Sequence, residues 1–355
     1  MKIKIKGRTI SEIKRKVNKK IHLKLADEIK IKHVDEIAIV PILKCNLNCI
    51  MCHQKQVKNK KEMSFEDFRI ILKQLKKAKV KKISLVGGEI FVHPRMWDFI
   101  IEMERMKFKY DISSNLFYVP GIENFKYLKG LEMVTTSLDG DEEIHNNIRR
   151  NPLAYQNTTK NIKILLKDKI RVDVACVVQK TNFDKLEYII DSVCKLNITH
   201  ITCLIENSID EDLKSQIEKK INAEIYLSSL KNPNGELTEK EFKQIPTKVK
   251  NMKEIAKKHN IKIGFSLQLL NPEVLNKETS LKNYTCSLFK GYNGMVFPDG
   301  TFNTCGFTKF LGNYNLLNNT PLEILNSEVY LKKRMQFKKY GANEMCRKCC
   351  ALKIK

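Results

Sequence analysis

The run Cys45-Asn46-Leu47-Asn48-Cys49-Ile50-Met51-Cys52 determines how the rest of this chain is interpreted. It places three cysteines on one short loop, with three residues between the first two and two residues between the last two. An iron–sulfur cube has four irons, each of which takes a terminal ligand, so three thiolates leave one iron open to a small molecule. The spacing therefore favours a cluster that binds a further ligand.

A structural zinc site is the alternative reading of clustered cysteines in an intracellular protein. Zinc sites usually combine two-residue spacings and close with four ligands, and no fourth cysteine lies near this triplet in the sequence. His53, directly after Cys52, is the neighbour able to complete such a site. The spacing favours iron–sulfur, and zinc stays the alternative.

Length and composition are those of a folded globular protein. The chain has 355 residues, 42% of them hydrophobic, which is enough for one large α/β domain and a smaller module. The N-terminal residues 1–6 alternate charged and apolar side chains and do not build the apolar run of a signal peptide or membrane span. We therefore expect a cytoplasmic protein with no membrane segment, whose clustered cysteines, among 11 in all, are metal thiolates.

The formal net charge of +25 comes from lysine, since the chain has 55 Lys and 10 Arg spread along its length. Nucleic-acid interfaces favour Arg for bidentate contacts and interleave basic residues with aromatic ones, and no such block occurs here. We therefore do not expect nucleic acid as a partner. A positive surface does favour an acidic electron donor, such as flavodoxin or ferredoxin, or an acidic substrate.

Apolar β-rich runs alternate with amphipathic helical stretches, which is the pattern of a parallel sheet with crossover helices. We expect strands at 36–42, 82–86, 109–113, 133–137, 171–178 and 198–205. We expect helices after the capping residue Ser64 and at 94–105, 153–166, 182–196 and 239–259. The predicted class is α/β, with too few strand–helix units for a closed eight-stranded barrel.

Gly87-Gly88-Glu89 ends the second expected strand. Two glycines allow a backbone to approach a ligand closely, and the acid beside them can accept a hydrogen bond from an ammonium group. A tight turn with an exposed acid is the alternative interpretation.

Small polar residues also follow the next two strands. Ser114 and Asn115 come after the third strand, Ser137 ends the fourth, and His145 and Arg149 follow it. Such residues are often only caps and turns.

Together the cysteine triplet, Gly87-Gly88-Glu89 and the segment 137–140 (Ser-Leu-Asp-Gly) resemble the radical S-adenosylmethionine (radical SAM) superfamily, although the usual proline after the acid is here Ile90. The resemblance implies an open, partial (β/α)6 barrel of TIM type with its site at the C-terminal ends of the strands. It implies that SAM chelates the open iron of the Cys45/Cys49/Cys52 cluster. Reductive cleavage would then give a 5′-deoxyadenosyl radical that abstracts hydrogen from an unactivated C–H bond.

The resemblance also assigns roles to the polar residues. Gly87, Gly88 and Glu89 would hold the amino end of SAM. Contacts with its carboxylate and ribose would come from Ser137 and, less directly matched to the family pattern, from Ser114, Asn115 and Arg149.

A second set of cysteines follows Tyr284: Cys286, Cys305, Cys346 and Cys349, with Cys350 adjacent. Four soft ligands close the coordination shell of a cube, which suits an electron relay or a structural anchor. Zinc is the alternative here too, and Cys350 is an alternative ligand to Cys349.

The order of these cysteines, with a helical stretch expected at 321–337, resembles the auxiliary-cluster extension called SPASM in its shortened form, Twitch. The resemblance implies one auxiliary [4Fe–4S] cluster in a small domain at 284–355. The other parts would be an N-terminal extension at 1–34 and a radical SAM core at 35–270, with an insertion near 208–247 that acts as a specificity element or is a solvated helical excursion.

Cys176 and Cys203 fall on expected strands, where an inward thiol is a conceivable hydrogen-atom donor to a substrate radical, although buried Cys mostly behaves as a small hydrophobe. The sequence leaves the substrate open between a small polar metabolite and a peptide or protein, with dehydrogenation, epimerisation or crosslinking as outcomes. The absence of an evident leader-binding segment in the first 34 residues mildly favours a small substrate. A zinc-stabilised basic nucleic-acid-binding protein is the alternative from another class.

Overall fold

The computed structural model describes residues 4–5, 8–9, 29–52, 61–206, 208–209, 215, 223–225, 229–230, 237–286, 293–305, 308–310, 314–342, 344–347, 349 and 351–355. Its central element is a nine-stranded sheet in the order β12-β8-β7-β6-β5-β4-β3-β14-β15. The strands of this sheet are β3 (Glu36–Ile39), β4 (Lys82–Leu85), β5 (Lys109–Ser113), β6 (Leu131–Ser137), β7 (Val172–Val178), β8 (His200–Ile205), β12 (Lys262–Phe265), β14 (Asn293–Val296) and β15 (Phe302–Asn303). All pairings are parallel except that of β14 with β15.

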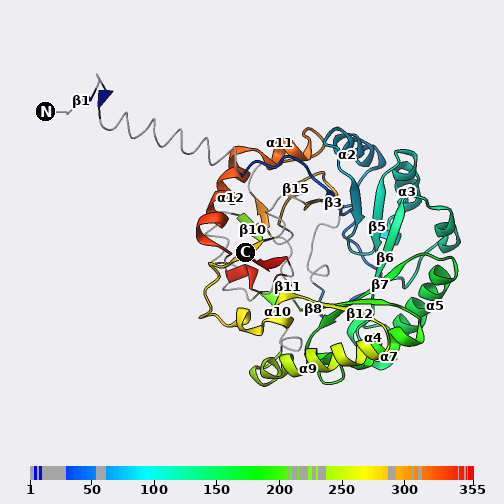
Figure 1. The fold of residues 1–355 in the computed structure, drawn as a ribbon. Coiled ribbons are helices and arrows are strands. Elements are labelled where there is room, and N and C mark those ends of the chain that lie inside the picture. Colours follow the sequence, from blue (N-terminus) through cyan, green and yellow to red (C-terminus); the bar gives the residue numbers. More distant parts are fainter. Residues whose placement is uncertain are drawn as a thin grey trace.

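Helices cover the outer face of this sheet, which curves like part of a barrel (Figure 1). They are α2 (Phe65–Lys77), α3 (Met96–Arg105), α4 (Glu142–Arg149), α5 (Ala154–Lys167), α6 (Lys180–Phe183), α7 (Tyr188–Lys195), α9 (Glu239–Lys258) and α10 (Leu267–Leu270), with short 3-10 turns at Ile90–Val92, Ile122–Tyr127 and Pro272–Leu275. Within the described ranges no ladder joins β12 to β15, so the sheet is an open α/β barrel, as expected.

The C-terminal segment adds α11 (Pro321–Leu325), α12 (Glu328–Tyr340), a 3-10 turn at Glu344–Cys346, and short strands. These strands are β13 (Tyr284–Cys286), which pairs with β17 (Leu352–Ile354), and β16 (Thr308–Phe310), which pairs with β10 (Ala223–Ile225). Four further short strands form two pairs: β1 (Lys4–Ile5) with β2 (Arg8–Thr9), and β9 (Ser208–Ile209) with β11 (Ser229–Leu230).

Helix α2 shows how local sequence produces this architecture. Ser64 caps it, since its hydroxyl accepts a hydrogen bond from the Asp67 N–H at 3.0 Å. Phe68, Ile71, Leu72 and Leu75 recur at helical spacing and are all buried. Residues at this spacing share one face, so α2 packs onto the sheet along a single apolar stripe.

The six expected strands are confirmed as β3 to β8, and most of the expected helices are present. The single helix expected at 182–196 is wrong, because the segment forms α6 and α7 with a turn between them. The Asn182 side chain accepts from the Gln179 N–H and donates to the Val177 carbonyl, at 2.9 Å in each case. The short helix α6 therefore begins at Lys180, two residues before the expected start, and contains Asn182.

The single helix expected at 321–337 is also divided, between α11 and α12. Asn326 lies at the break, and its side-chain amide pairs with the backbone of Ile31, with N–O distances of 2.8 and 2.9 Å. A contact across 295 residues of sequence has no local signal, so the sequence pattern missed it.

Three strands of the sheet were not expected: β12, β14 and β15. β12 is short and contains Gly264, and β14 comes from the C-terminal segment and extends the sheet beside β3. The domain boundaries expected at 270 and 284 therefore stay a prediction. Strand β14 of the C-terminal part pairs with β3 of the core and so connects the two parts. Most of the segment 208–238 lies outside the described residues, and the rest of the expected insertion belongs to α9.

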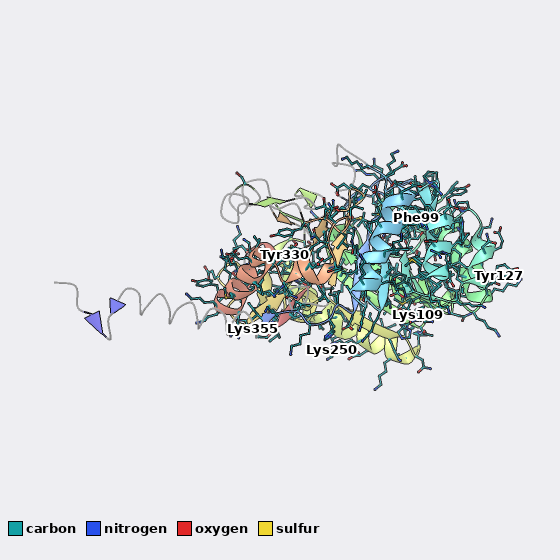
Figure 2. All side chains as sticks on the ribbon, turned by 90° about the horizontal axis from the view of Figure 1, so that it is seen from above. Phe99, Lys109, Tyr127, Lys250, Tyr330 and Lys355 are labelled. Carbon is teal, nitrogen blue, oxygen red and sulfur yellow. The ribbon has the colours of Figure 1, made fainter. Side chains whose placement is uncertain are left out.

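No helix in the described part of the chain has the length and apolar character needed to cross a bilayer. Lys109, Lys250 and Lys355 lie on separate parts of the surface in Figure 2, in keeping with a dispersed positive charge.

Candidate active site

The cysteine triplet lies on the loop that follows β3, at the C-terminal end of the sheet. Cys49 is buried, whereas Cys45 and Cys52 are partly exposed. The Ile50 N–H donates to the Ile148 carbonyl at 2.9 Å, which ties this loop to α4. The loop is therefore supported by a helix that follows β6.

Hydrogen-bond donors lie close to the sulfurs of Cys45 and Cys49. The Cys45 Sγ accepts from the Leu47 N–H at 3.4 Å and from the Asn115 side-chain amide at 3.7 Å. The Cys49 Sγ accepts from the Arg149 guanidinium at 3.7 Å. Donors and positive charge beside a sulfur stabilise its thiolate form, which is the form that binds metal.

The donor set fits an iron–sulfur cluster. Burial raises the pKa of the Cys45 thiol to about 11, opposed by the Leu47 N–H, and a metal ion deprotonates such a thiol on binding. Within the described ranges, no three histidine, cysteine or acidic side chains are already arranged as a metal site, here or at the C-terminal cysteines. His53, the residue that would favour zinc, lies outside the described residues.

The Gly87-Gly88-Glu89 segment crosses directly over the start of the cysteine loop. The Gly88 N–H donates to the Ile42 carbonyl at 3.0 Å, and the Glu89 N–H donates to the Lys44 carbonyl at 2.9 Å. A Cβ added at Gly88 would lie 2.1 Å from the Lys44 carbonyl oxygen. Glycine is required here because two backbones meet without room for a side chain.

The Glu89 carboxylate is fully buried and connects the loop after β4 with the residues that follow β5. It accepts from the Ser114 hydroxyl at 2.8 Å, the Asn115 N–H at 2.7 Å and the Phe91 N–H at 3.2 Å. Burial raises its pKa to about 7, against these three hydrogen bonds, which lower it. A buried carboxylate of this kind is prepared to receive a cation.

We predict that Gly88→Ala destabilises the protein by at least about 1–3 kcal/mol and displaces the loop at Lys44, because the new methyl group overlaps backbone. Gly264→Ala is the matched control, since its nearest contact would be 3.6 Å, an ordinary van der Waals distance. Urea unfolding of the two metal-free variants measures the difference. Equal stability of the two variants would contradict the crossing of backbones at Gly88.

Arg149 is part of a buried ion pair that the sequence did not point to. Its Nε lies 2.7 Å from the Asp139 Oδ2, and Asp139 is fully buried. Burial alone would raise the pKa of Asp139, but Arg149 and His145 hold it at about 2. The Asp139 N–H donates to the His145 Nδ1, and burial lowers the pKa of His145 against the neighbouring Asp139, which raises it.

The structure therefore places only some of the expected site residues in contact with one another. Contacts connect Cys45 through Asn115 to Glu89 and Ser114, and a separate contact connects Cys49 to Arg149. Ser137 lies beside Ala175 in the ladder between β6 and β7, and its role stays a prediction. Asp139 was missed as a site residue although it stands in the Ser-Leu-Asp-Gly segment.

Cys176 and Cys203 are neighbours in the ladder of β7 with β8, and both are 0% exposed. They alternate with the more exposed Ala175 and Thr202, which face the other side of the sheet. Both thiols belong to the apolar core, so the structure gives no support to a hydrogen-donor role for either.

A small antiparallel sheet joins two of the segments that carry the C-terminal cysteines. Cys286 on β13 pairs with Leu352 on β17, and the Cys349 N–H donates to the Cys346 carbonyl at 3.0 Å. Cys305 lies two residues after β15, and Cys350 lies outside the described residues, so the choice between it and Cys349 stays open.

Gln268 holds this cysteine turn against the barrel, although no sequence motif marks this residue. The side chain is fully buried, and its amide group donates to the carbonyls of Arg347 and Cys349, each at 2.8 Å. A polar residue on the short helix α10 thus fixes the position of the C-terminal set relative to β12.

An open α/β barrel with a three-cysteine loop at the C-terminal ends of its strands defines a class of iron–sulfur enzyme fold. Residues 39–193 of this chain match the model of the radical SAM superfamily. Members of this superfamily use a [4Fe–4S] cluster and SAM.

Two curated proteins resemble this region. The antilisterial bacteriocin subtilosin biosynthesis protein AlbA of Bacillus subtilis (strain 168) is 31% identical over 144 residues, which cover 39% of this chain and 32% of AlbA. A probable GTP 3′,8-cyclase of Methanocaldococcus jannaschii is 30% identical over 147 residues, which cover 39% of this chain and 46% of that protein. The match thus spans less than half of either relative.

The similarity in fold extends further than the similarity in sequence. The crystal structure of Streptococcus suis SuiB bound to the precursor peptide SuiA superposes with a TM-score of 0.64, covering 94% of this chain and 74% of SuiB at 15% identity. The resemblance therefore includes the C-terminal segment as well as the barrel.

Proposed function

We propose that this protein is a radical SAM enzyme that modifies a peptide. The observation that carries the proposal is the connection between the cysteine loop and the Gly87-Gly88-Glu89 segment. Asn115 makes this connection, since its backbone N–H donates to the buried Glu89 carboxylate and its side-chain amide donates to the Cys45 sulfur. Cys45, Cys49 and Cys52 would hold the SAM-binding cluster. When bound, the cluster and SAM supply a radical that abstracts hydrogen from an unreactive carbon.

The chain's own residues would bind and orient SAM. The Glu89 carboxylate would accept a hydrogen bond from the amino group of SAM, and the backbone of Gly87 and Gly88 would allow the close approach. Ser114 and Asn115 hold the Glu89 carboxylate in position, and Ser137 and Arg149 would contact the carboxylate and ribose. Asp139 would hold Arg149 in place through their ion pair.

Cys286, Cys305, Cys346 and Cys349 would hold an auxiliary [4Fe–4S] cluster. Four thiolates complete its coordination, so this cluster would exchange electrons and leave SAM to the first site. The similarity of fold to SuiB across 94% of the chain supports an extension of this type.

A peptide is the favoured substrate because AlbA is a bacteriocin biosynthesis protein and SuiB is described with a bound precursor peptide. A small polar metabolite is the second candidate, which the match to a probable GTP 3′,8-cyclase supports. Oxidoreductase chemistry with dehydrogenation, crosslinking or epimerisation as the outcome is part of the proposal, and so is an acidic electron donor.

Anaerobically reconstituted protein tests the activity. We expect a brown protein with about eight irons that releases 5′-deoxyadenosine from SAM after addition of dithionite. Cys49→Ala should abolish this release, whereas Cys194→Ala, on α7 and away from both sets, should not change it. Colourless protein carrying stoichiometric zinc would instead support a zinc-stabilised basic binding protein.

The substrate class is tested by mass spectrometry with short peptides encoded beside the gene. Loss of about two hydrogens indicates dehydrogenation or crosslinking, and uptake of deuterium from solvent without a change of formula indicates epimerisation. If only nucleotides or other small metabolites increase 5′-deoxyadenosine release, the peptide proposal is replaced by the second candidate.

A further inference from the structure

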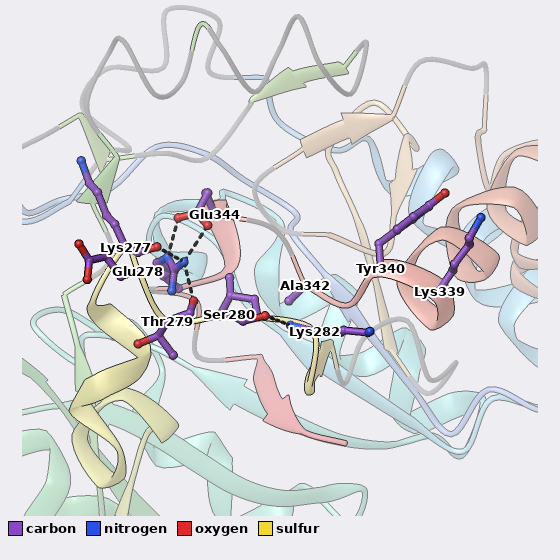
Figure 3. Close-up of a pocket in the computed structure, with 11 residues that line it drawn as sticks. Lys277, Glu278, Thr279, Ser280, Lys282, Lys339, Tyr340, Ala342 and Glu344 are labelled. Carbon is purple, nitrogen blue, oxygen red and sulfur yellow. Dashed lines mark hydrogen bonds and ion pairs between the residues drawn. The ribbon is translucent and has the colours of Figure 1, made fainter.

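A pocket of about 630 Å³ lies beside the C-terminal cysteines (Figure 3). One wall is the segment 277–282, and the other is the end of α12 with the residues that lead into the Cys346 turn. None of the residues proposed to hold SAM lines it.

The rim of this pocket is basic. Lys277, Lys282 and Lys339 are exposed, and none of them forms an ion pair with a described residue. The Glu344 carboxylate is already occupied by Arg347, with an N–O distance of 2.7 Å. The rim therefore presents three exposed ammonium groups, of which that of Lys339 lies over the Tyr340 ring at 4.8 Å from its centroid, and one exposed acid, Glu278.

Large apolar side chains are exposed beside these lysines. Tyr340 on the rim is 63% exposed and Ile354 on β17 is 60% exposed. The Lys355 N–H donates to the Asn283 carbonyl, which brings β17 next to Lys282. Exposed aromatic residues surrounded by charge are typical of protein contact surfaces.

The pocket and the cysteine turn form one packed unit. Leu281 and Ala342 line the pocket and pack in the same small apolar cluster as Cys346. Arg347, the residue after Cys346, is buried and donates to the carbonyls of Lys277 and Thr279, at 2.9 Å in each case. One layer of side chains therefore separates the basic rim from an expected cluster ligand.

We propose that this basic pocket is the docking surface for an acidic one-electron carrier protein, which passes electrons to the auxiliary cluster. The inference rests on the proposed function and adds the place where the carrier binds. One electron leaves the reduced carrier and one electron enters the auxiliary cluster, with no bond formed or broken. A small rim of lysines around a tyrosine suits redox encounters, whose interfaces are small and electrostatically steered.

Charge reversal tests the surface. In K277E/K282E/K339E we expect the kcat/KM for SAM cleavage driven by reduced flavodoxin to fall by about tenfold or more at low ionic strength, and the wild-type rate to fall with added salt. The control K160E/K163E/K167E changes the net charge equally on exposed positions of α5, far from α12 in Figure 1, and should lose less than about twofold. Dithionite-driven cleavage should be the same in all three proteins.

Two results would overturn the docking surface: equal loss in both triple variants, or a wild-type enzyme that dithionite reduces and flavodoxin does not. Failure of the proposed function gives a different result, since the wild-type protein would then release no 5′-deoxyadenosine even with dithionite. Tyr340→Ser provides a second variant with unchanged charge, and we expect it to weaken flavodoxin-driven cleavage alone.

Discussion

The affinity for SAM should fall by about tenfold for each pH unit below about 7, and it should level off above that pH. The cause is Glu89, because burial raises the pKa of this carboxyl to about 7. The amino group of SAM donates its hydrogen bond to the ionised carboxylate, so protonation of Glu89 competes with SAM. Isothermal titration of the reconstituted protein at a series of pH values measures the effect.

The same group sets the pH dependence of stability in the metal-free protein. The pKa of Glu89 in the folded state lies above its ordinary value of 4.5, so the folded state holds the proton more tightly than the unfolded state. Its contribution is therefore full below pH 4.5 and is lost as the pH rises through about 7, by about 3 kcal/mol in total. Urea unfolding across this range measures the slope.

Glu89→Gln is the decisive variant because it removes the charge and keeps the size of the side chain. We expect weak SAM binding at every pH and loss of the pH slope in stability. Glu104→Gln is the control, since Glu104 accepts hydrogen bonds from Tyr110 and Gly130 away from the site. A variant Glu89→Gln that binds SAM with the wild-type pH profile would rule out Glu89 as the ammonium partner.

Local patterns in the sequence predicted the parts of the fold that depend on local physics. Alternating apolar residues in the six core strands and the capping residue Ser64 are signals contained within a few residues. The break at Asn326 was missed because its partner, Ile31, lies far away in the sequence. Strand β14 was missed for the same reason, since only its pairing with β3 makes it part of the sheet.

The candidate site divides in the same way. Spacing alone identified the cysteine triplet and the Gly87-Gly88-Glu89 segment, because each is a contiguous motif. The contacts that join them are tertiary: Asn115 with Cys45, Arg149 with Cys49, and Gln268 with the Cys349 turn. Cys176 and Cys203 show a limit of such patterns, since position on a strand does not say which face of the sheet a side chain occupies.

We expect the buried ion pair of Asp139 and Arg149 to affect both the stability of the fold and the SAM-binding cluster. The two effects can be measured separately. Arg149→Met leaves the fully buried Asp139 carboxylate without its guanidinium, which should cost about 3–5 kcal/mol in the free energy of unfolding. The double variant D139N/R149M removes both charges and should recover most of that loss. Arg150→Met is the matched control, because it removes the same charge from the next, exposed residue.

The cluster gives an independent measurement, because Arg149 also donates to the Cys49 sulfur. Positive charge and N–H donors near cluster sulfurs favour the reduced state, so Arg149→Met and the double variant should both shift the midpoint potential of the SAM-binding cluster to more negative values. Arg150→Met should leave it unchanged. If D139N/R149M recovers both stability and potential, Arg149 acts only through Asp139, and its contact with Cys49 has no influence on the cluster.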